Sequence, residues 1–325
     1  MTLEHGGKLA EAVALYGHAR EAWLDLSTGL NPQSYPVPAL PEHAWHRLPE
    51  ASQALVEAAC HYYDAPRLLP VAGSQAAIQA LPRLRQRSRV VLAAPAYAEH
   101  AYRWRRAGHK VTEVPYAELD GMVDACEVMV VCNPNNPTGA TVEPGVLRAW
   151  AERLAARGGW LVVDEAFADV DRRLGAVSDT PGLIVLRSIG KFFGLAGLRL
   201  GFVCAEQTLL NALAEEIGPW SVSEAAQLIG TAALRDETWQ NTMQARLQHD
   251  GARLKALLAG CDIAAHGCAL FQWWREPRAE EFTRHMAQRA IWVRKFDHGG
   301  IRLGLPHQEH DWQRLAMALN EWISR

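Results

Sequence analysis

Short continuous apolar runs alternate with longer amphipathic stretches through the first two-thirds of the chain. The runs are rich in β-branched residues, which is typical of strands buried on both faces; they cover 90–95, 128–134, 160–167, 183–188 and 198–204. Helix-like stretches at 73–87, 143–159 and 206–217 separate them. This alternation predicts an α/β fold with an open, largely parallel sheet between helices. Ligands of such sheets bind beyond the carboxyl ends of the strands.

The pattern changes near residue 221. A long helical stretch, 221–260, precedes strand-like runs at 269–275, 290–296 and 301–306 and a closing helix at 311–324. The sequence therefore predicts a second, smaller α+β domain. The predicted domains are a large domain at 36–220 and a linking helix with the small domain at 221–325, which the N-terminal segment 1–35 joins.

Composition narrows the class of protein. A chain of 325 residues is long enough for two unequal domains. A net charge of −3 gives no basic surface for nucleic acid or an anionic membrane. No apolar run reaches the roughly 18 residues of a membrane span, and the N-terminus has no signal-peptide pattern. The six cysteines are scattered without metal-ligand spacing, so we expect a cytoplasmic protein with reduced thiols and no metal site.

Polar groups follow several predicted strands. Gly73 and Ser74 begin a helix, where exposed N–H groups and a hydroxyl favour a phosphate, although a plain helix cap is the alternative. Asp164 directly follows a buried strand and suits either an ion pair or a cationic heteroaromatic nitrogen. Lys191 lies among glycines and precedes two phenylalanines, which indicates partial burial. Burial lowers a lysine pKa and leaves a nucleophilic amine.

The ordered motifs of the chain point to a known family. GSQ at 73–75, NPNNPTG at 133–139, DEAF at 164–167, SIGK at 188–191 and GLAGLRLG at 194–201 each stand at a predicted strand end. This set resembles the fold-type I pyridoxal-5′-phosphate (PLP) enzymes of the class I/II aminotransferase group. The resemblance implies a mostly parallel sheet of the seven-stranded type in the large domain, and a homodimer.

The resemblance also implies roles for individual residues. Lys191 would form a Schiff base with PLP and then move protons, while Asp164 would keep the ring nitrogen protonated. Asn136 would hydrogen-bond the ring oxygen O3′, and Tyr97 would stack on the ring. The groups expected at the cofactor phosphate are Gly73, Ser74, Gln75, Ser188, Arg199 and, from across a dimer interface, Tyr63, for which Tyr62 is an equal alternative. Many relatives carry tyrosine where this chain has Phe167, so one donor to O3′ is missing.

Two further regions suggest a substrate. His-Gly-Gly at 5–7 and LDLSTGLNP at 24–32 resemble the start of the L-threonine-O-3-phosphate decarboxylases of cobalamin biosynthesis, although Lys8 departs from the usual asparagine. Arg302 matches the family arginine that binds the substrate α-carboxylate through a bidentate pair. Arg294 is the candidate for the substrate phosphate, with His5 assisting. Gly29 and Asn136 complete the predicted substrate site.

These observations favour PLP-dependent decarboxylation of L-threonine O-3-phosphate to (R)-1-amino-2-propanol phosphate. The motifs do not encode which Cα bond stands perpendicular to the ring, and this orientation separates decarboxylation from transamination. A histidinol-phosphate-type aminotransferase therefore stays open as an alternative. The second alternative is a PLP-binding module without turnover, which has no need for a carboxylate-binding arginine.

Overall fold

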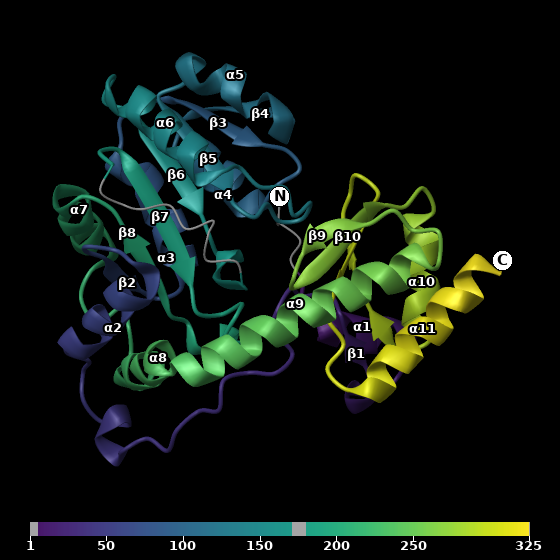
Figure 1. The fold of residues 1–325 in the computed structure, drawn as a ribbon. Helices are drawn as coiled ribbons and strands as arrows, with labels where there is room; N and C mark the ends of the chain where they lie inside the picture. The colour runs from purple at the N-terminus through teal and green to yellow at the C-terminus, as the bar shows by residue number, and fades with distance from the viewer. Residues whose placement is uncertain (1–5, 171–179, 325) are drawn as a thin grey trace. The chain divides into compact units, whose positions relative to one another are not determined.

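The computed structural model describes residues 6–170 and 180–324 (Figure 1). The chain divides into two compact units. The large unit comprises Ser34–Asn136 and Ala140–Thr242, and the small unit comprises Met1–Gln33, Pro137–Gly139 and Met243–Arg325. The predicted domain boundaries near residues 35 and 220 stay a prediction, since compactness alone does not define an independently folding domain.

A seven-stranded sheet organises the described part of the large unit. Its order is β2-β8-β7-β6-β5-β3-β4, and all neighbours are parallel except those of β8. The strands are β2 (Leu69–Val71), β3 (Arg89–Ala93), β4 (Lys110–Val114), β5 (Val128–Cys132), β6 (Trp160–Asp164), β7 (Leu183–Ser188) and β8 (Gly201–Cys204). The five strand-like runs predicted in this part of the sequence are confirmed. Strand β2 is only three residues long and contains Pro70, and the edge strand β4 is polar, so both escape prediction.

The register of the sheet brings the predicted motifs to one edge. Parallel strands end at the same edge, which places the residues that follow β3, β5, β6 and β7 there. Strand β8 runs the opposite way and therefore begins at this edge, with Gly201 paired to both Ser188 and Val71. The turn after β2 consequently lies beside the end of β7.

Helices cover both faces of the sheet. On one face α3 (Ser74–Ala80), α4 (Ala98–Arg106) and α7 (Gln207–Ile217) bury a shared apolar core against the strands. Val130 of β5, Val162 of β6 and Ile184 of β7 belong to this core. Successive residues of a strand face opposite sides of the sheet, so only alternate residues of each strand reach it. On the other face α6 (Pro144–Ala155) contacts β6 and β7. The remaining helices of the large unit are α2 (Gln53–Tyr63), α5 (Leu119–Met122) and α8 (Glu224–Arg235).

Single residues explain two departures from the predicted helices. The predicted helix 73–87 is α-helical only to Ala80, because Pro82 has no N–H and a tighter turn follows at Leu81–Leu84. The predicted stretch 221–260 is two helices, α8 and α9 (Glu237–Ala259), which Asp236 separates. The Asp236 carboxylate accepts a hydrogen bond from Trp239 N at 3.0 Å and so caps the second helix.

The small unit combines short strands with helices. One antiparallel sheet has the order β12-β13-β10-β9, and a parallel pair joins β1 to β11. Its strands are β1 (Leu24–Asp25), β9 (His266–Cys268), β10 (Phe271–Arg275), β11 (Ile291–Trp292), β12 (Arg294–Lys295) and β13 (Gly300–Gly304), and its other helices are α1 (Leu9–Tyr16), α10 (Ala279–Ala287) and α11 (Glu309–Ile323). The predicted strand-like runs and the closing helix are therefore confirmed. None of the helices in the described ranges has the length and apolar character that a bilayer crossing requires.

Candidate active site

Asp164 is the last residue of β6 and lies buried at the carboxyl edge of the sheet. Its Oδ1 accepts a hydrogen bond from Ala166 N at 3.1 Å. Its Oδ2 lies 2.9 Å from Nε2 of His100, a buried residue of α4. A carboxylate offers about four lone-pair sites, so two remain for a further donor. The position suits a carboxylate that holds a cationic ring nitrogen.

Lys191 lies in the glycine-rich turn that follows β7. Its Nζ stands 5.4 Å from the centre of the Phe167 ring, and its carbonyl accepts a hydrogen bond from Gly194 N at 3.2 Å. Because Phe167 follows Asp164 by three residues, the lysine amine lies near the end of β6. The side chain is half-buried. The structure thus brings the predicted lysine to the edge where the predicted aspartate ends its strand.

Three segments meet tightly beside this turn. A Cβ built on Gly73 would lie 2.5 Å from Nη2 of Arg199, and one built on Gly201 would lie 2.6 Å from Ser74 N. Arg199 has a left-handed backbone (φ 55°), and its Nη1 donates to Ala196 O at 2.9 Å. Ser188 Oγ accepts a hydrogen bond from Gly190 N at 3.3 Å. A guanidinium, backbone N–H groups and a hydroxyl therefore lie close together, and only glycine at positions 73 and 201 leaves room for them. Such a cluster of hydrogen-bond donors suits an anion.

Tyr97 is held by a chain of side-chain hydrogen bonds. Its hydroxyl donates to Gln75 Oε1 at 3.2 Å, and Gln75 Nε2 donates to Glu99 Oε2 at 2.8 Å. Arg103 Nε donates to the same Glu99 oxygen at 2.8 Å. Burial, with added repulsion from Glu99 and Asp164, raises the pKa of Tyr97, so its hydroxyl stays protonated. The predicted cofactor residues Gln75 and Tyr97 are thus direct neighbours.

The asparagines after β5 divide into two roles. Asn133 binds Val142 twice, donating from Nδ2 at 3.1 Å and accepting at Oδ1 at 2.8 Å. Asn135 Nδ2 donates to Pro95 O at 2.9 Å and ties this loop to the segment before Tyr97. Both are fully buried, whereas Asn136 is partly exposed. Of the three, Asn136 is therefore the one whose amide can reach a ligand.

Tyr63 lies in the interior of the large unit. Its ring packs against Tyr62 at 4.8 Å and Phe202 at 5.6 Å, and the guanidinium carbon of buried Arg187 lies 4.9 Å from its centre. Burial raises the pKa of its hydroxyl well above the ordinary value. This environment is that of a packing residue; the predicted contact with a partner subunit stays a prediction.

The small unit contains a second group of predicted residues. Arg302, on β13, is buried, and its Nη2 donates to Ser27 O at 2.8 Å. Arg294, on β12, is its cross-strand neighbour. Burial, together with the positive charge of Arg294, lowers the pKa of Arg302 to about 10. Two guanidinium groups on one face of a sheet suit anionic ligands.

The N-terminal glycines pack on the same segment as Arg302. Gly7 N donates to Ser27 Oγ at 2.9 Å, and a Cβ on Gly6 would lie 2.5 Å from Ser27 O. Ser27 in turn donates from Oγ to Asp25 Oδ1 at 2.6 Å. The two sequence motifs that suggested the substrate are therefore in contact. Gly29 is buried two residues further on, and His5 lies outside the described residues.

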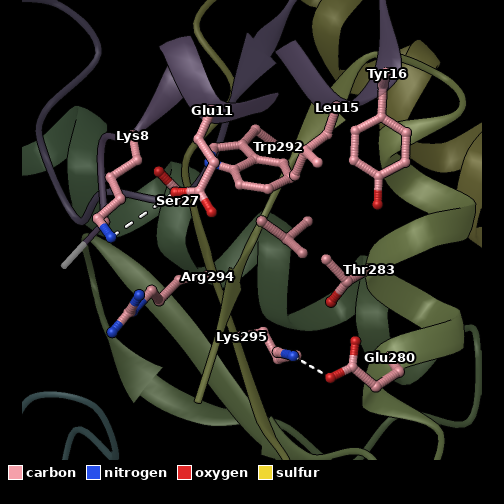
Figure 2. Close-up of a pocket in the computed structure, with 12 residues that line it drawn as sticks. Lys8, Glu11, Leu15, Tyr16, Ser27, Glu280, Thr283, Trp292, Arg294 and Lys295 are labelled. Carbon is pink, nitrogen blue, oxygen red and sulfur yellow. Dashed lines mark hydrogen bonds and ion pairs between the residues drawn. The ribbon is translucent and has the colours of Figure 1, made fainter. Parts of the chain in front are cut away.

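A pocket in the small unit opens beside this segment (Figure 2). Gly6, Lys8, Ser27 and Arg294 belong to its lining. Lys295 pairs with Glu280 at the other part of the pocket, and Figure 2 shows this pair apart from Lys8 and Arg294. The remaining lining residues are Glu11, Leu15, Tyr16, Thr283, Trp292 and Val293.

Sequence reasoning missed His100 and the carboxylate of Glu99. Neither belongs to a motif, although both stand within three residues of Tyr97 on α4. Within the described residues, His100, Cys132 and Asp164 also bring possible metal-ligand atoms within 4.8 Å of one another. Tetrahedral zinc ligands about 2.0–2.1 Å from the metal would lie roughly 3.3 Å apart, so the 2.9 Å between His100 and Asp164 fits a direct hydrogen bond better.

Comparison with known families defines the class of protein. The model of the family "Aminotransferase class I and II" matches residues 35–321. The chain belongs to this family. The predicted fold, a fold-type I architecture with a large mostly parallel sheet and a smaller sheet, is confirmed.

Individual relatives of this chain have names that are more specific than the family description. The chain is 51% identical over 321 residues to a threonine-phosphate decarboxylase of Pseudomonas aeruginosa, covering 98% of this chain and 97% of that protein. It is 42% identical to a threonine-phosphate decarboxylase of a Sinorhizobium species, with 97% of each chain covered. The crystal structure of L-threonine-O-3-phosphate decarboxylase from Porphyromonas gingivalis superimposes with a TM-score of 0.78 at 18% identity, covering 92% of this chain and 98% of that one, and supports the fold.

Proposed function

We propose that this chain is a PLP-dependent lyase that decarboxylates L-threonine O-3-phosphate in cobalamin biosynthesis. The observation that carries the proposal is the 51% identity to a threonine-phosphate decarboxylase over 98% of the chain. The products are CO₂ and (R)-1-amino-2-propanol phosphate, and Cα gains one proton where the carboxyl group leaves.

The large unit fits the cofactor. Arg199, Ser74 N and Ser188 lie close together around Gly73 and Gly201, where an added Cβ would clash with Arg199 Nη2 or Ser74 N. This cluster of a guanidinium, a backbone N–H and a hydroxyl suits the phosphate of PLP. Asp164 has lone pairs left for the ring nitrogen. Tyr97, fixed through Gln75, would lie on a ring face, and Asn136 would donate to the ring oxygen. When bound, PLP supplies a cationic ring that accepts the electron pair released as the Cα–carboxyl bond breaks.

Lys191 would hold the cofactor covalently through Nζ. Its half-buried position beside the Phe167 ring keeps the amine partly out of water. Burial favours the neutral, nucleophilic form of a lysine amine. Released from the cofactor, the same amine would carry a proton.

The small unit would bind both anions of the substrate. Arg302 is buried and held by Ser27 O, so its guanidinium is pre-oriented for the α-carboxylate. Arg294 faces the pocket lined by Gly6, Lys8 and Ser27, which suits the phosphate. A substrate with two anionic groups accounts for two neighbouring arginines better than a substrate with one.

The decisive test is to incubate the purified protein and PLP with L-threonine O-3-phosphate and to measure CO₂ and the amine. We expect CO₂ and (R)-1-amino-2-propanol phosphate in equal amounts. Rapid formation of a keto acid with 2-oxoglutarate, without CO₂, would instead identify a histidinol-phosphate-type aminotransferase.

The assembly and location are part of the same proposal. The large unit exposes four large apolar side chains that are 54–71% accessible: Val37, Trp45, Leu48 and Trp220. Exposed apolar groups of this kind support a homodimer. Light scattering that gives the mass of a single chain would contradict the homodimer.

All six cysteines are free, which supports a location in the reducing cytoplasm.

A further inference from the structure

Glu99 is a buried carboxylate that belongs to none of the sequence motifs. It lies in the first turn of α4, two residues after Tyr97, and its side chain is 8% exposed. Glutamates in the first turn of a helix usually stay in water, where they interact with the helix dipole. Glu99 instead accepts hydrogen bonds from Gln75 of α3 and Arg103 of α4. Taking a charge out of water costs free energy, so its burial calls for an explanation beyond helix stability.

The hydrogen bonds of this cluster have a fixed direction. Arg103 can only donate, and the ionised carboxylate beside it can only accept. Gln75 must therefore turn Nε2 toward Glu99, at 2.8 Å. Its Oε1 then faces the Tyr97 hydroxyl at 3.2 Å and accepts a hydrogen bond from it. The charge of Glu99 thus decides which end of the amide meets the tyrosine.

The Tyr97 hydroxyl lies within reach of the charges of the proposed cofactor site. Burial is the first cause of its raised pKa, followed by the charges of Glu99 and Asp164, while Arg199 acts in the opposite direction. The ring packs against the apolar core that α3 and α4 share with the sheet, and it meets His100 edge-on at 6.0 Å. Tyr97 is therefore held twice, by packing of its ring and by the hydrogen bond at its hydroxyl.

We propose that Glu99 is a positioning residue for Tyr97. Its carboxylate, paired with Arg103, orients the Gln75 amide. That amide holds the Tyr97 hydroxyl and so fixes the aromatic ring on the face of PLP. Glu99 acts through Tyr97 and not on the reacting atoms. This inference rests on the proposed stacking of Tyr97 on the cofactor ring.

A set of variants separates this role from simple packing. Glu99→Leu removes the acceptor of the Gln75 amide, and Tyr97→Phe removes the hydroxyl but keeps the ring. Tyr97→Ala removes the ring and is the reference for complete loss of stacking. The matched control is Glu113→Leu, which removes a carboxylate that pairs with Arg105 of the same helix at the surface of the unit.

The readouts are the dissociation constant of PLP and the visible circular dichroism of bound PLP, which reports how aromatic side chains lie against the cofactor. We expect Glu99→Leu to weaken PLP binding about threefold to tenfold, the range of one net hydrogen bond. Its dichroism should change in the same direction as that of Tyr97→Ala. Glu99→Gln, which keeps the size of the side chain but loses its charge, should give a smaller change of the same sign. Glu113→Leu should change neither readout.

The double variant of Glu99→Leu with Tyr97→Phe shows whether the effect passes through the hydroxyl. We expect it to bind PLP as Tyr97→Phe alone does, because the group through which Glu99 acts is already absent. Losses that multiply in the double variant would indicate a packing role and overturn the inference. Wild-type affinity and dichroism in both Glu99→Leu and Glu99→Gln would also overturn it.

The same measurements separate this inference from the proposals beneath it. Wild-type PLP binding and dichroism in Tyr97→Ala would refute the stacking of Tyr97, and the role of Glu99 with it. A wild-type protein that binds PLP but releases no CO₂ from L-threonine O-3-phosphate would refute the decarboxylase proposal alone and leave the role of Glu99 intact.

Discussion

Arg294 and Arg302 are directly paired across adjacent antiparallel strands, so two positively charged side chains lie on one face of the same small sheet. Like charges in this position repel each other, and a bound anion would relieve this repulsion. Burial of Arg302 adds to the cost of its charge. The pair therefore supports the proposed anion site on this face of the small unit through an observation that is independent of any motif.

Replacing Arg302 by lysine should impair substrate binding. Lysine keeps the charge but loses the planar, bidentate donor pair and the bond to Ser27 O. We expect kcat/KM for L-threonine O-3-phosphate to fall roughly tenfold to a hundredfold, as for the loss of one hydrogen bond to a charged group. The control is Arg275→Lys on the neighbouring strand β10, where the side chain is exposed. Equal kcat/KM for both variants would argue against a carboxylate-binding role.

Gly73→Ala should weaken PLP binding. The added methyl group would lie 2.5 Å from Nη2 of Arg199, so the guanidinium must leave its place. We expect the dissociation constant of PLP, measured by absorbance, to rise about tenfold or more, because a charge-assisted bond to phosphate is lost. Gly108→Ala is the matched control, since Gly108 also has a positive φ (88°) but no atom within 4 Å of the added methyl group. Its affinity for PLP should stay unchanged, and a similar loss in both variants would assign the effect to backbone strain.

Phe167→Tyr should restore the donor that many relatives have. Phe167 lies beside the Lys191 amine, and a hydroxyl on its ring could donate to O3′ of the bound cofactor. Such a bond stabilises the deprotonated form of the bound cofactor. The midpoint of its absorbance titration should fall by about one pH unit, the equivalent of one ordinary hydrogen bond. An unchanged or higher midpoint would show that the tyrosine does not reach O3′.

The stability of the protein without PLP should depend on His100 at alkaline pH. The pKa of His100 is raised from an ordinary 6.5 to about 10, so its contribution is fully present below pH 6.5 and is lost as the pH rises through about 10. The free energy of unfolding should therefore fall by at most about 1.4 kcal/mol per pH unit over this interval. Urea titrations of His100→Gln should lack this slope, and those of His109→Gln should retain it. The same slope in both variants would contradict the assignment.

The sequence predicts well what continuous patterns encode. Asp164, Ser188 and the turn of Lys191 follow apolar runs, and the ends of parallel strands meet at one edge of a sheet. The large sheet and the positions of these residues could therefore be predicted from the sequence. The contact of His100 with Asp164 could not, because it comes from the packing of α4 against β6, which no local pattern reports. The break at Asp236 was missed for a different reason. A capping aspartate within a long amphipathic stretch looks like any exposed helical residue.

In the small unit too, the sequence does not show which residues are neighbours in the fold. Arg302 was predicted from the family resemblance and Arg294 from a strand-like run, but only the register of β12 and β13 shows that they are neighbours. The contact of Gly7 with Ser27 likewise joins residues 20 positions apart. Tyr63 packs against Tyr62 and Phe202 in the core of the large unit, and no local pattern in the sequence reports these contacts.

The most direct test of the account is to find the lysine that carries PLP. The chain has five lysines, and Lys191 is the one in the turn beside Phe167. The protein with bound PLP is reduced with borohydride, digested, and its peptides are analysed by mass spectrometry, with Lys295→Ala as a control that should keep the label. We expect the pyridoxyl group on Lys191 and loss of the Schiff-base absorbance band in Lys191→Ala. A label on another lysine, or unchanged absorbance in Lys191→Ala, would contradict it.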